Sequence, residues 1–278
     1  MRFTILGAGG FIGSALAQYL REQGHECHTP ARTVSPPNGS ASPALGHVLY
    51  CIGLTADFRN RPFDTARAHV GDLIPWLEHG TFESFLYLSS TRIYSRAAAT
   101  HEDGTIIACP GDPDDLYNLT KAAGESVCLA LQDPRIRVAR LSSVVGERGN
   151  THDFLNALLE EGARNGKVIL RSHWECAKDY IRLEDVTKVL PKIAAFGSHR
   201  IYNVASGMNL ANASVCAAIS EVTGWEIRLQ PNAPIVRSLP VDIGRARQEF
   251  GFSPAEVLPA IRALAKRHAS AATTSHAP

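Results

Sequence analysis

A cluster of glycines close to the N-terminus constrains the fold more than any other feature of this sequence. The apolar run at residues 3–6 ends at Gly7, and the segment after Gly13 places apolar residues at helical spacing. A strand, a tight turn and a helix in this order can bind a pyrophosphate, because the loop amides and the helix N-terminus point towards it. A glycine-rich turn without a ligand is the alternative, and the strand–helix context favours a dinucleotide site.

The three glycines of this loop have separate structural tasks. Gly7 can adopt the backbone angles of a sharp turn, Gly10 leaves space for a ligand, and Gly13 allows the helix to pack on the strand. We expect these glycines, together with Phe11 and Ile12, to bind the cofactor. The glycines recur at every third position, whereas the commonest dinucleotide fingerprint reads G-x-G-x-x-G.

Composition excludes several classes of function. The 278 residues are 45% hydrophobic and 20% charged, with a formal net charge of +1, which gives no argument for a nucleic-acid or membrane partner. The six cysteines are scattered and show no metal-ligand spacing. We therefore expect free thiols, a cytoplasmic location and no metal site.

The second strand indicates which dinucleotide is bound. We expect this strand at residues 25–29, and an NAD-binding fold would place an acidic residue near its end. Arg32 follows here instead, and a guanidinium can pair with a 2′-phosphate. This pattern favours NADP(H), with NAD(H) as the alternative if Arg32 is only a surface loop residue.

The chain before residue 47 is too short for another strand and crossover, so one edge strand is expected to be missing or shortened.

The order of expected elements predicts an α/β protein: a Rossmann-type, doubly wound parallel sheet with a smaller C-terminal substrate lobe. Residues 1–145 are assigned to the dinucleotide-binding domain, and residues 180–205 return to it. The substrate lobe is assigned to residues 146–179 and 206–269. Residues 270–278 are small and polar, and we expect a disordered tail.

Hydroxyl side chains follow the strand expected at residues 83–89. Ser90 and Thr91 lie at its C-terminal end, where open α/β sheets bind ligands. Helix capping is the structural alternative for these hydroxyls.

A tyrosine and a lysine share one face of the helix expected at residues 116–131. Tyr117 and Lys121 are four residues apart, so their side chains lie on the same side. Reduction of a ketone needs a proton for the oxygen, and a free tyrosine titrates near 10. The Lys121 ammonium would lower the pKa of Tyr117, and Ser90 would hold the substrate oxygen. A surface pair without catalytic function is the alternative.

The glycine loop, Ser90 and the pair Tyr117 and Lys121, in this order, resemble the extended short-chain dehydrogenase/reductases. This family includes nucleotide-sugar epimerases, dehydratases and reductases. The resemblance implies that Ser90, Tyr117 and Lys121 are catalytic and that Lys121 also binds the nicotinamide ribose. It further implies that a homodimer is possible.

The resemblance also implies four substrate-binding residues. Thr91 follows the catalytic serine, and Ser143 lies in a segment similar to the strand that opens towards the sugar nucleotide. Lys178 and Arg237 are candidates for the substrate diphosphate. Lys178 stands where the family usually has arginine, and lysine lacks the bidentate fork. Solvated surface charge is the alternative for both cations.

The residues after Ser90 separate the activities within this family. Dehydratases of this type have an Asp-Glu pair there, whereas this chain has Thr91 and Arg92. We therefore predict an NADP(H)-dependent oxidoreductase that reduces the keto group of a nucleotide-activated sugar. An NAD-dependent nucleotide-sugar epimerase is the first alternative. A non-catalytic dinucleotide-binding sensor is the second, and the intact Ser90, Tyr117 and Lys121 argue against it.

Overall fold

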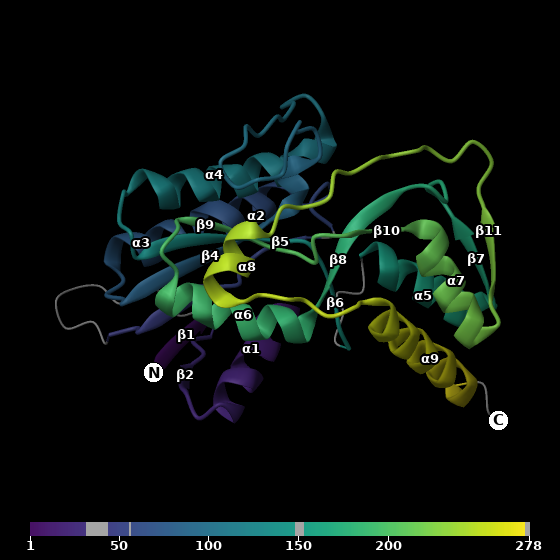
Figure 1. The fold of residues 1–278 in the computed structure, drawn as a ribbon, viewed down its shortest axis with the longest axis horizontal. Helices are drawn as coiled ribbons and strands as arrows, with labels where there is room; N and C mark the ends of the chain where they lie inside the picture. The colour runs from purple at the N-terminus through teal and green to yellow at the C-terminus, as the bar shows by residue number, and fades with distance from the viewer. Residues whose placement is uncertain (32–43, 56, 148–152, 276–278) are drawn as a thin grey trace.

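The computed structural model describes residues 1–31, 44–55, 57–147 and 153–275. Within these residues, the central element is a six-stranded parallel sheet with the strand order β2-β1-β3-β4-β5-β9 (Figure 1). Its strands are β1 (Arg2–Leu6), β2 (Glu26–His28), β3 (His47–Tyr50), β4 (Ser84–Ser90), β5 (Ile136–Leu141) and β9 (Ile201–Val204). The predicted Rossmann-type sheet is confirmed.

The direction in which successive strands are added to the sheet reverses at β1. β1 pairs with β2 on one side and with β3 on the other, so the carboxyl ends of β1 and β3 form the switch point where such sheets bind ligands. Among the described residues β2 is the outermost strand on this side. Residues 32–43, where a further strand would follow, lie outside the described part.

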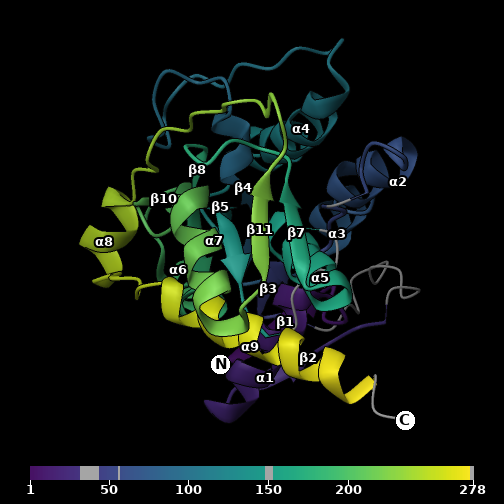
Figure 2. The same ribbon diagram turned by 90° about the vertical axis from the view of Figure 1, so that its right-hand side faces the viewer.

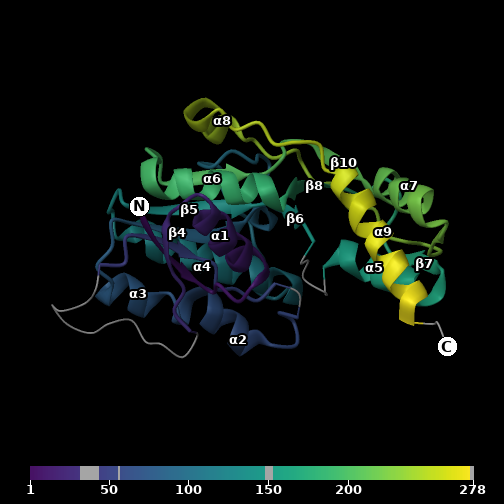
Figure 3. The same cartoon turned by 90° about the horizontal axis from the view of Figure 1, so that it is seen from below.

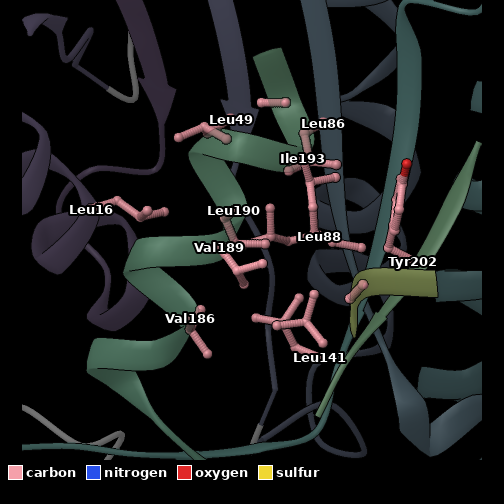
Figure 4. Close-up of a cluster of buried hydrophobic side chains, with 14 of the residues drawn as sticks. Leu16, Leu49, Leu86, Leu88, Leu141, Val186, Val189, Leu190, Ile193 and Tyr202 are labelled. Atoms are coloured by element: carbon pink, nitrogen blue, oxygen red, sulfur yellow. The ribbon is translucent and has the colours of Figure 1, made fainter. Parts of the chain in front are cut away.

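Helices cover both faces of the sheet (Figure 3). Helices α1 (Phe11–Glu22) and α6 (Leu183–Phe196) contact each other on one face. Apolar side chains fill the space beneath them, including Leu16, Leu190 and Leu88 (Figure 4). The other face is covered by α2 (Pro62–Ala66), one π-helical turn (Arg67–Gly71), α3 (Ile74–His79) and α4 (Leu116–Ala130). Two separate apolar layers therefore enclose the sheet.

A smaller lobe lies beside the carboxyl edge of the sheet (Figures 1 and 2). Its strands are β6 (Ser143–Val145), β8 (Ala177–Arg182) and β10 (Asn209–Ala211) in one sheet, and β7 (Lys167–Leu170) and β11 (Glu226–Leu229) in another. Its helices are α5 (Phe154–Asn165), α7 (Asn212–Thr223) and α9 (Leu258–Ser275). Buried apolar side chains from all three helices form a second core.

The structure departs from the expected organisation at two places. Helix α8 (Gly244–Phe250) lies in a segment assigned to the substrate lobe, but it packs on β9 of the large sheet, where Ala246 joins the core. The tail expected to be disordered from Ser270 is helical to Ser275, because its alanines have high helix propensity and extend α9. No helix in the described part of the chain is long and apolar enough to cross a membrane.

Helix α4 is fixed to the sheet by a buried ion pair. The Arg140 guanidinium on β5 donates to both carboxylate oxygens of Glu125, with Nη2 2.6 Å from Oε2. Both side chains are only 3% exposed. Burial lowers the pKa of Arg140, but the hydrogen bonds and charge of Glu125 raise it above its ordinary value. Gly124 allows the close approach, since a Cβ there would lie 2.4 Å from the Tyr87 hydroxyl oxygen.

Replacing Glu125 with Gln is expected to destabilise the fold by about 3–5 kcal/mol, because it leaves the Arg140 guanidinium buried without a counter-charge. The exposed pair between Glu221 and Arg262 provides a matched control, and Glu221→Gln should change stability by less than about 1 kcal/mol. Urea unfolding followed by circular dichroism measures both variants. Equal losses in the two variants would contradict the role assigned to the buried pair.

Candidate functional site

The glycine loop forms an open cradle at the N-terminus of α1. Gly7 has a φ of +87°, a conformation that favours glycine, and its carbonyl accepts from the Gly10 amide at 3.0 Å. A Cβ on Gly13 would lie 2.3 Å from the Gly7 carbonyl oxygen, so only glycine fits. No side chain caps α1, and the space beside Gly9 is open, whereas a Cβ on Gly10 would lie 3.3 Å from the Gly7 carbonyl oxygen. The cradle therefore suits an anionic group such as a pyrophosphate.

The two bulky residues of the loop point in different directions. Ile12 packs against the core beneath α1 and α6. Phe11 reaches the end of β6, where a Cβ on Gly146 would lie 3.3 Å from its ring. Phe11 therefore lies where the large sheet meets the lobe, next to the expected cofactor loop.

The structure brings Ser90 and Tyr117 together. Ser90 ends β4, and its Oγ accepts from the Arg92 amide at 3.2 Å, which starts a 3₁₀ turn over residues 91–94. Tyr117 lies in the first turn of α4, is 5% exposed, and is close enough to the Ser90 side chain for that hydroxyl to lower its pKa. Ser90 therefore both caps a turn and lies beside Tyr117 at the carboxyl edge of the sheet.

The Tyr117 ring lies among three side chains. Its centroid is 5.6 Å from that of Phe58 and 5.2 Å from that of His69, and the Arg92 guanidinium carbon lies 5.6 Å above it. Burial raises the pKa of Tyr117 above its ordinary value, although the Ser90 hydroxyl and the Arg92 charge lower it. The groups that favour the phenolate are thus Ser90 and Arg92, and Lys121 is not among the groups that lower the pKa of Tyr117.

Lys121 is directed towards the end of β4. Its Nζ donates to the Leu88 carbonyl at 2.8 Å, and its side chain is buried. Burial lowers the pKa of Lys121 to about 8, whereas the charge of Glu125 raises it. A cation at this position can bind a hydroxyl or stabilise a neighbouring anion, since few other groups compensate its charge.

His69 lies in the π-helical turn, next to Lys121. Its Nε2 accepts from the Leu54 amide at 3.2 Å, so Nδ1 carries the proton and donates to Thr120 Oγ1 at 2.8 Å. Burial and the charge of Lys121 lower the pKa of His69 to about 2. The imidazole is therefore neutral and links α4 to the loop after β3.

The expected substrate-binding residues are more widely spread. The Thr91 hydroxyl donates to the Leu141 carbonyl at 3.4 Å, and Ser143 lies on β6, paired with Tyr180 of β8. Lys178 extends from β8 over the Phe154 and Tyr180 rings, with Nζ 4.7 and 4.9 Å from their centroids.

Arg237, a further predicted substrate-binding cation, is exposed. The Arg237 side chain is 82% exposed, and its nearest carboxylate is that of Glu175, at 3.8 Å. A backbone bridge joins Arg237 to Ala177, so it follows the edge of β8. Arg32 lies outside the described residues.

Sequence reasoning missed three residues around Tyr117: Phe58, His69 and Arg92. Phe58 and His69 carry no motif, and they reach the site only because the loop and the π-helical turn pack on α4. Arg92 did carry a signal, since it stands where related dehydratases have an acid. In the sequence, the presence of Arg92 in place of that acid argues only against dehydration.

The arrangement supports proton transfer to an oxygen. A neutral, buried phenol beside a serine hydroxyl can bind and protonate a carbonyl oxygen, and Lys121 and Arg92 supply nearby positive charge. The glycine cradle lies at the neighbouring β1–β3 switch point.

The chain is similar to known proteins over nearly its whole length. A UDP-glucose 4-epimerase from Corynebacterium glutamicum is 22% identical over 300 residues, which cover 91% of each chain. The structure of RMD from Pseudomonas aeruginosa complexed with NADPH is similar with a TM-score of 0.78, 20% identity and coverage of 97% of this chain and 100% of that chain. A UDP-glucuronic acid 4-epimerase from Bacillus cereus, in complex with UDP-glucuronic acid and NAD, has a TM-score of 0.77, 17% identity and coverage of 96% and 99%.

A family model gives the assignment. The model described as the NAD dependent epimerase/dehydratase family matches residues 3–69 and 47–205, which is more than half of the chain. This match spans the glycine loop, Ser90, Tyr117 and Lys121, and it confirms the resemblance to the extended short-chain dehydrogenase/reductases. The chain belongs to the NAD dependent epimerase/dehydratase family.

Proposed function

We propose that this protein is an NADP(H)-dependent oxidoreductase that reduces the keto group of a nucleotide-activated sugar. The observation that carries the proposal is the position of Tyr117, a buried phenol in the first turn of α4 with the Arg92 guanidinium 5.6 Å from its ring, and burial raises the pKa of this phenol. A protonated tyrosine is the form that a reduction needs, because the substrate oxygen must receive a proton.

The cofactor residues are those of the cradle. Gly7, Gly10 and Gly13, with the first amides of α1 at Phe11 and Ile12, would hold the pyrophosphate. Lys121 would bind the nicotinamide ribose. When bound, the nicotinamide supplies hydride chemistry.

Side chains of this protein then bind the substrate oxygen and transfer the proton. Ser90 binds the carbonyl oxygen and orients it, and Tyr117 donates its hydroxyl proton to that oxygen. The ammonium of Lys121 and the guanidinium of Arg92 stabilise the phenolate that remains. Because the Ser90 hydroxyl lies near enough to act on the Tyr117 phenol, a substrate oxygen bound to the serine would lie close to the proton donor.

Three observations support NADP(H) and net reduction. The segment around β2 has no acidic residue at its end, and Arg32 follows it. Thr91 and Arg92 replace the acidic pair of the dehydratases. The structurally similar RMD was solved with NADPH.

Epimerisation with NAD is the second candidate. It is favoured by the relative from Corynebacterium glutamicum, which is a UDP-glucose 4-epimerase and covers 91% of the chain. The same Ser90 and Tyr117 would serve it, with the tyrosine accepting and then returning the proton. In either reaction Thr91, Ser143, Lys178 and Arg237 are the proposed substrate contacts, the two cations facing the diphosphate.

Tyr117→Phe tests the proton donor. The variant keeps the ring between Phe58 and His69 but loses the hydroxyl, so kcat should fall about 10²–10⁴-fold. NADPH binding, followed by fluorescence titration, should stay unchanged. Retained turnover in a folded variant would exclude Tyr117 as the proton donor.

The retained cofactor distinguishes reduction from epimerisation. A reductase releases its oxidised cofactor after each turnover, so we expect the purified protein to bind NADPH exchangeably and more tightly than NADH. Arg32→Ala should remove most of that preference, since the 2′-phosphate loses its cation. Tightly copurifying NAD, identified by mass spectrometry after denaturation, would instead support the epimerase.

The cradle is tested by two glycine substitutions in one loop. Gly13→Ala places a Cβ 2.3 Å from the Gly7 carbonyl oxygen and should weaken dinucleotide binding at least about tenfold, because the helix end moves from the loop. Gly9→Ala is the matched control, since a Cβ there meets no atom within 4 Å. Calorimetric titration with NADPH measures both variants. Equal affinities would show that the pyrophosphate does not bind at this loop.

A further inference from the structure

Two cations lie where the large sheet meets the lobe. Arg92 lies in the 3₁₀ turn after β4, and Lys178 lies on β8, with its Nζ over the Phe154 and Tyr180 rings. Burial lowers the pKa of Lys178 to about 8, the charge of Asp153 raises it, and the charge of Arg92 adds a smaller lowering. Within the described parts of the chain, neither side chain forms an ion pair with a carboxylate.

The neighbouring acidic groups are already engaged. Asp114 pairs with Arg59, which also stacks on Phe58, and Asp115 accepts from Arg96 Nε at 2.8 Å. Asp153, the acid closest in effect to Lys178, caps α5 by accepting from the backbone amide and side chain of Asn156. These contacts leave the charges of Arg92 and Lys178 available to an anionic ligand.

Arg92 is placed beside the reacting centre. Its guanidinium carbon lies 5.6 Å from the Tyr117 ring centroid and 5.0 Å from that of Phe58, and Nη2 makes only a long 3.4 Å contact to the Asp114 carbonyl. Packing lowers the pKa of Arg92 although part of the side chain faces solvent. A substrate group within reach of this guanidinium lies on the sugar, because the carbon served by Tyr117 is a ring carbon.

We propose that the substrate is a nucleotide-activated sugar acid, whose carboxylate is bound by Arg92 and supported by Lys178. A planar guanidinium can bind both oxygens of a carboxylate at once. A second cation adds positive charge without requiring a fixed orientation. Lys178 then faces the sugar's own acid group, in place of the diphosphate considered above. This inference rests on the proposed function, because it concerns the substrate of the same site.

The test compares two probes that differ only at one carbon. UDP-glucuronic acid carries a carboxylate where UDP-glucose carries a hydroxymethyl group. Calorimetric titration of the NADP⁺-saturated protein should show at least about tenfold tighter binding of the acid, as a charge-assisted bidentate pair provides. Arg92→Gln should reduce this ratio to about twofold or less, and Lys178→Met should reduce it in part.

Arg59→Gln is the matched control. Arg59 stacks on the same Phe58 ring and lies beside the same Asp114, so its loss should leave the ratio unchanged. Arg92→Lys keeps the charge without the fork and should give an intermediate ratio, which also covers the case in which Arg92→Gln does not fold.

Three outcomes would overturn the proposal: equal binding of both probes, binding of neither, or an equal loss for both probes in Arg92→Gln. The last result would assign Arg92 to the diphosphate. Because the readout is binding, Tyr117→Phe should keep the preference for the acid. A protein that prefers the acid but does not turn it over would therefore contradict only the proposed reaction.

Discussion

The buried ion pair between Glu125 and Arg140 determines where the reactive helix lies. Glu125, Lys121 and Tyr117 are spaced four residues apart on α4, so fixing the first of them to β5 fixes the other two at the edge of the sheet. The same carboxylate raises the pKa of Lys121 against the effect of burial. One interaction thus holds the helix in place and helps keep its lysine charged.

Close backbone approach makes this arrangement possible at two places. Gly13 brings the start of α1 against the turn after β1, and Gly124 brings α4 against Tyr87 of β4. The first contact exposes helix amides to an anion, and the second places Tyr117 and Lys121 near the carboxyl end of the neighbouring strand. In both cases a single Cβ would displace a helix that carries functional groups.

Electrostatics at the reactive tyrosine depend on residues that are distant in sequence. Its own helix supplies Lys121, but the groups that lower its pKa are Ser90 and Arg92. His69 stays neutral beside Lys121, so it adds no charge near Tyr117. The surroundings of Tyr117 therefore combine a protonated phenol with positive charge nearby, which suits protonation of an oxygen and stabilisation of the phenolate left behind.

The sequence by itself determined the features that are encoded locally: the glycine turn, the hydroxyls at a strand end, and the tyrosine and lysine at helical spacing. These patterns follow from backbone angles and helix periodicity, so they were sufficient for the parallel sheet and the family. Only the tertiary structure decided which side chains surround Tyr117, because Phe58, His69 and Arg92 meet through packing between separate elements. It also decided that the charge of Arg92 acts on Lys178 while Arg237 stays exposed, since burial and charge neighbourhood arise from long-range contacts that no local pattern records.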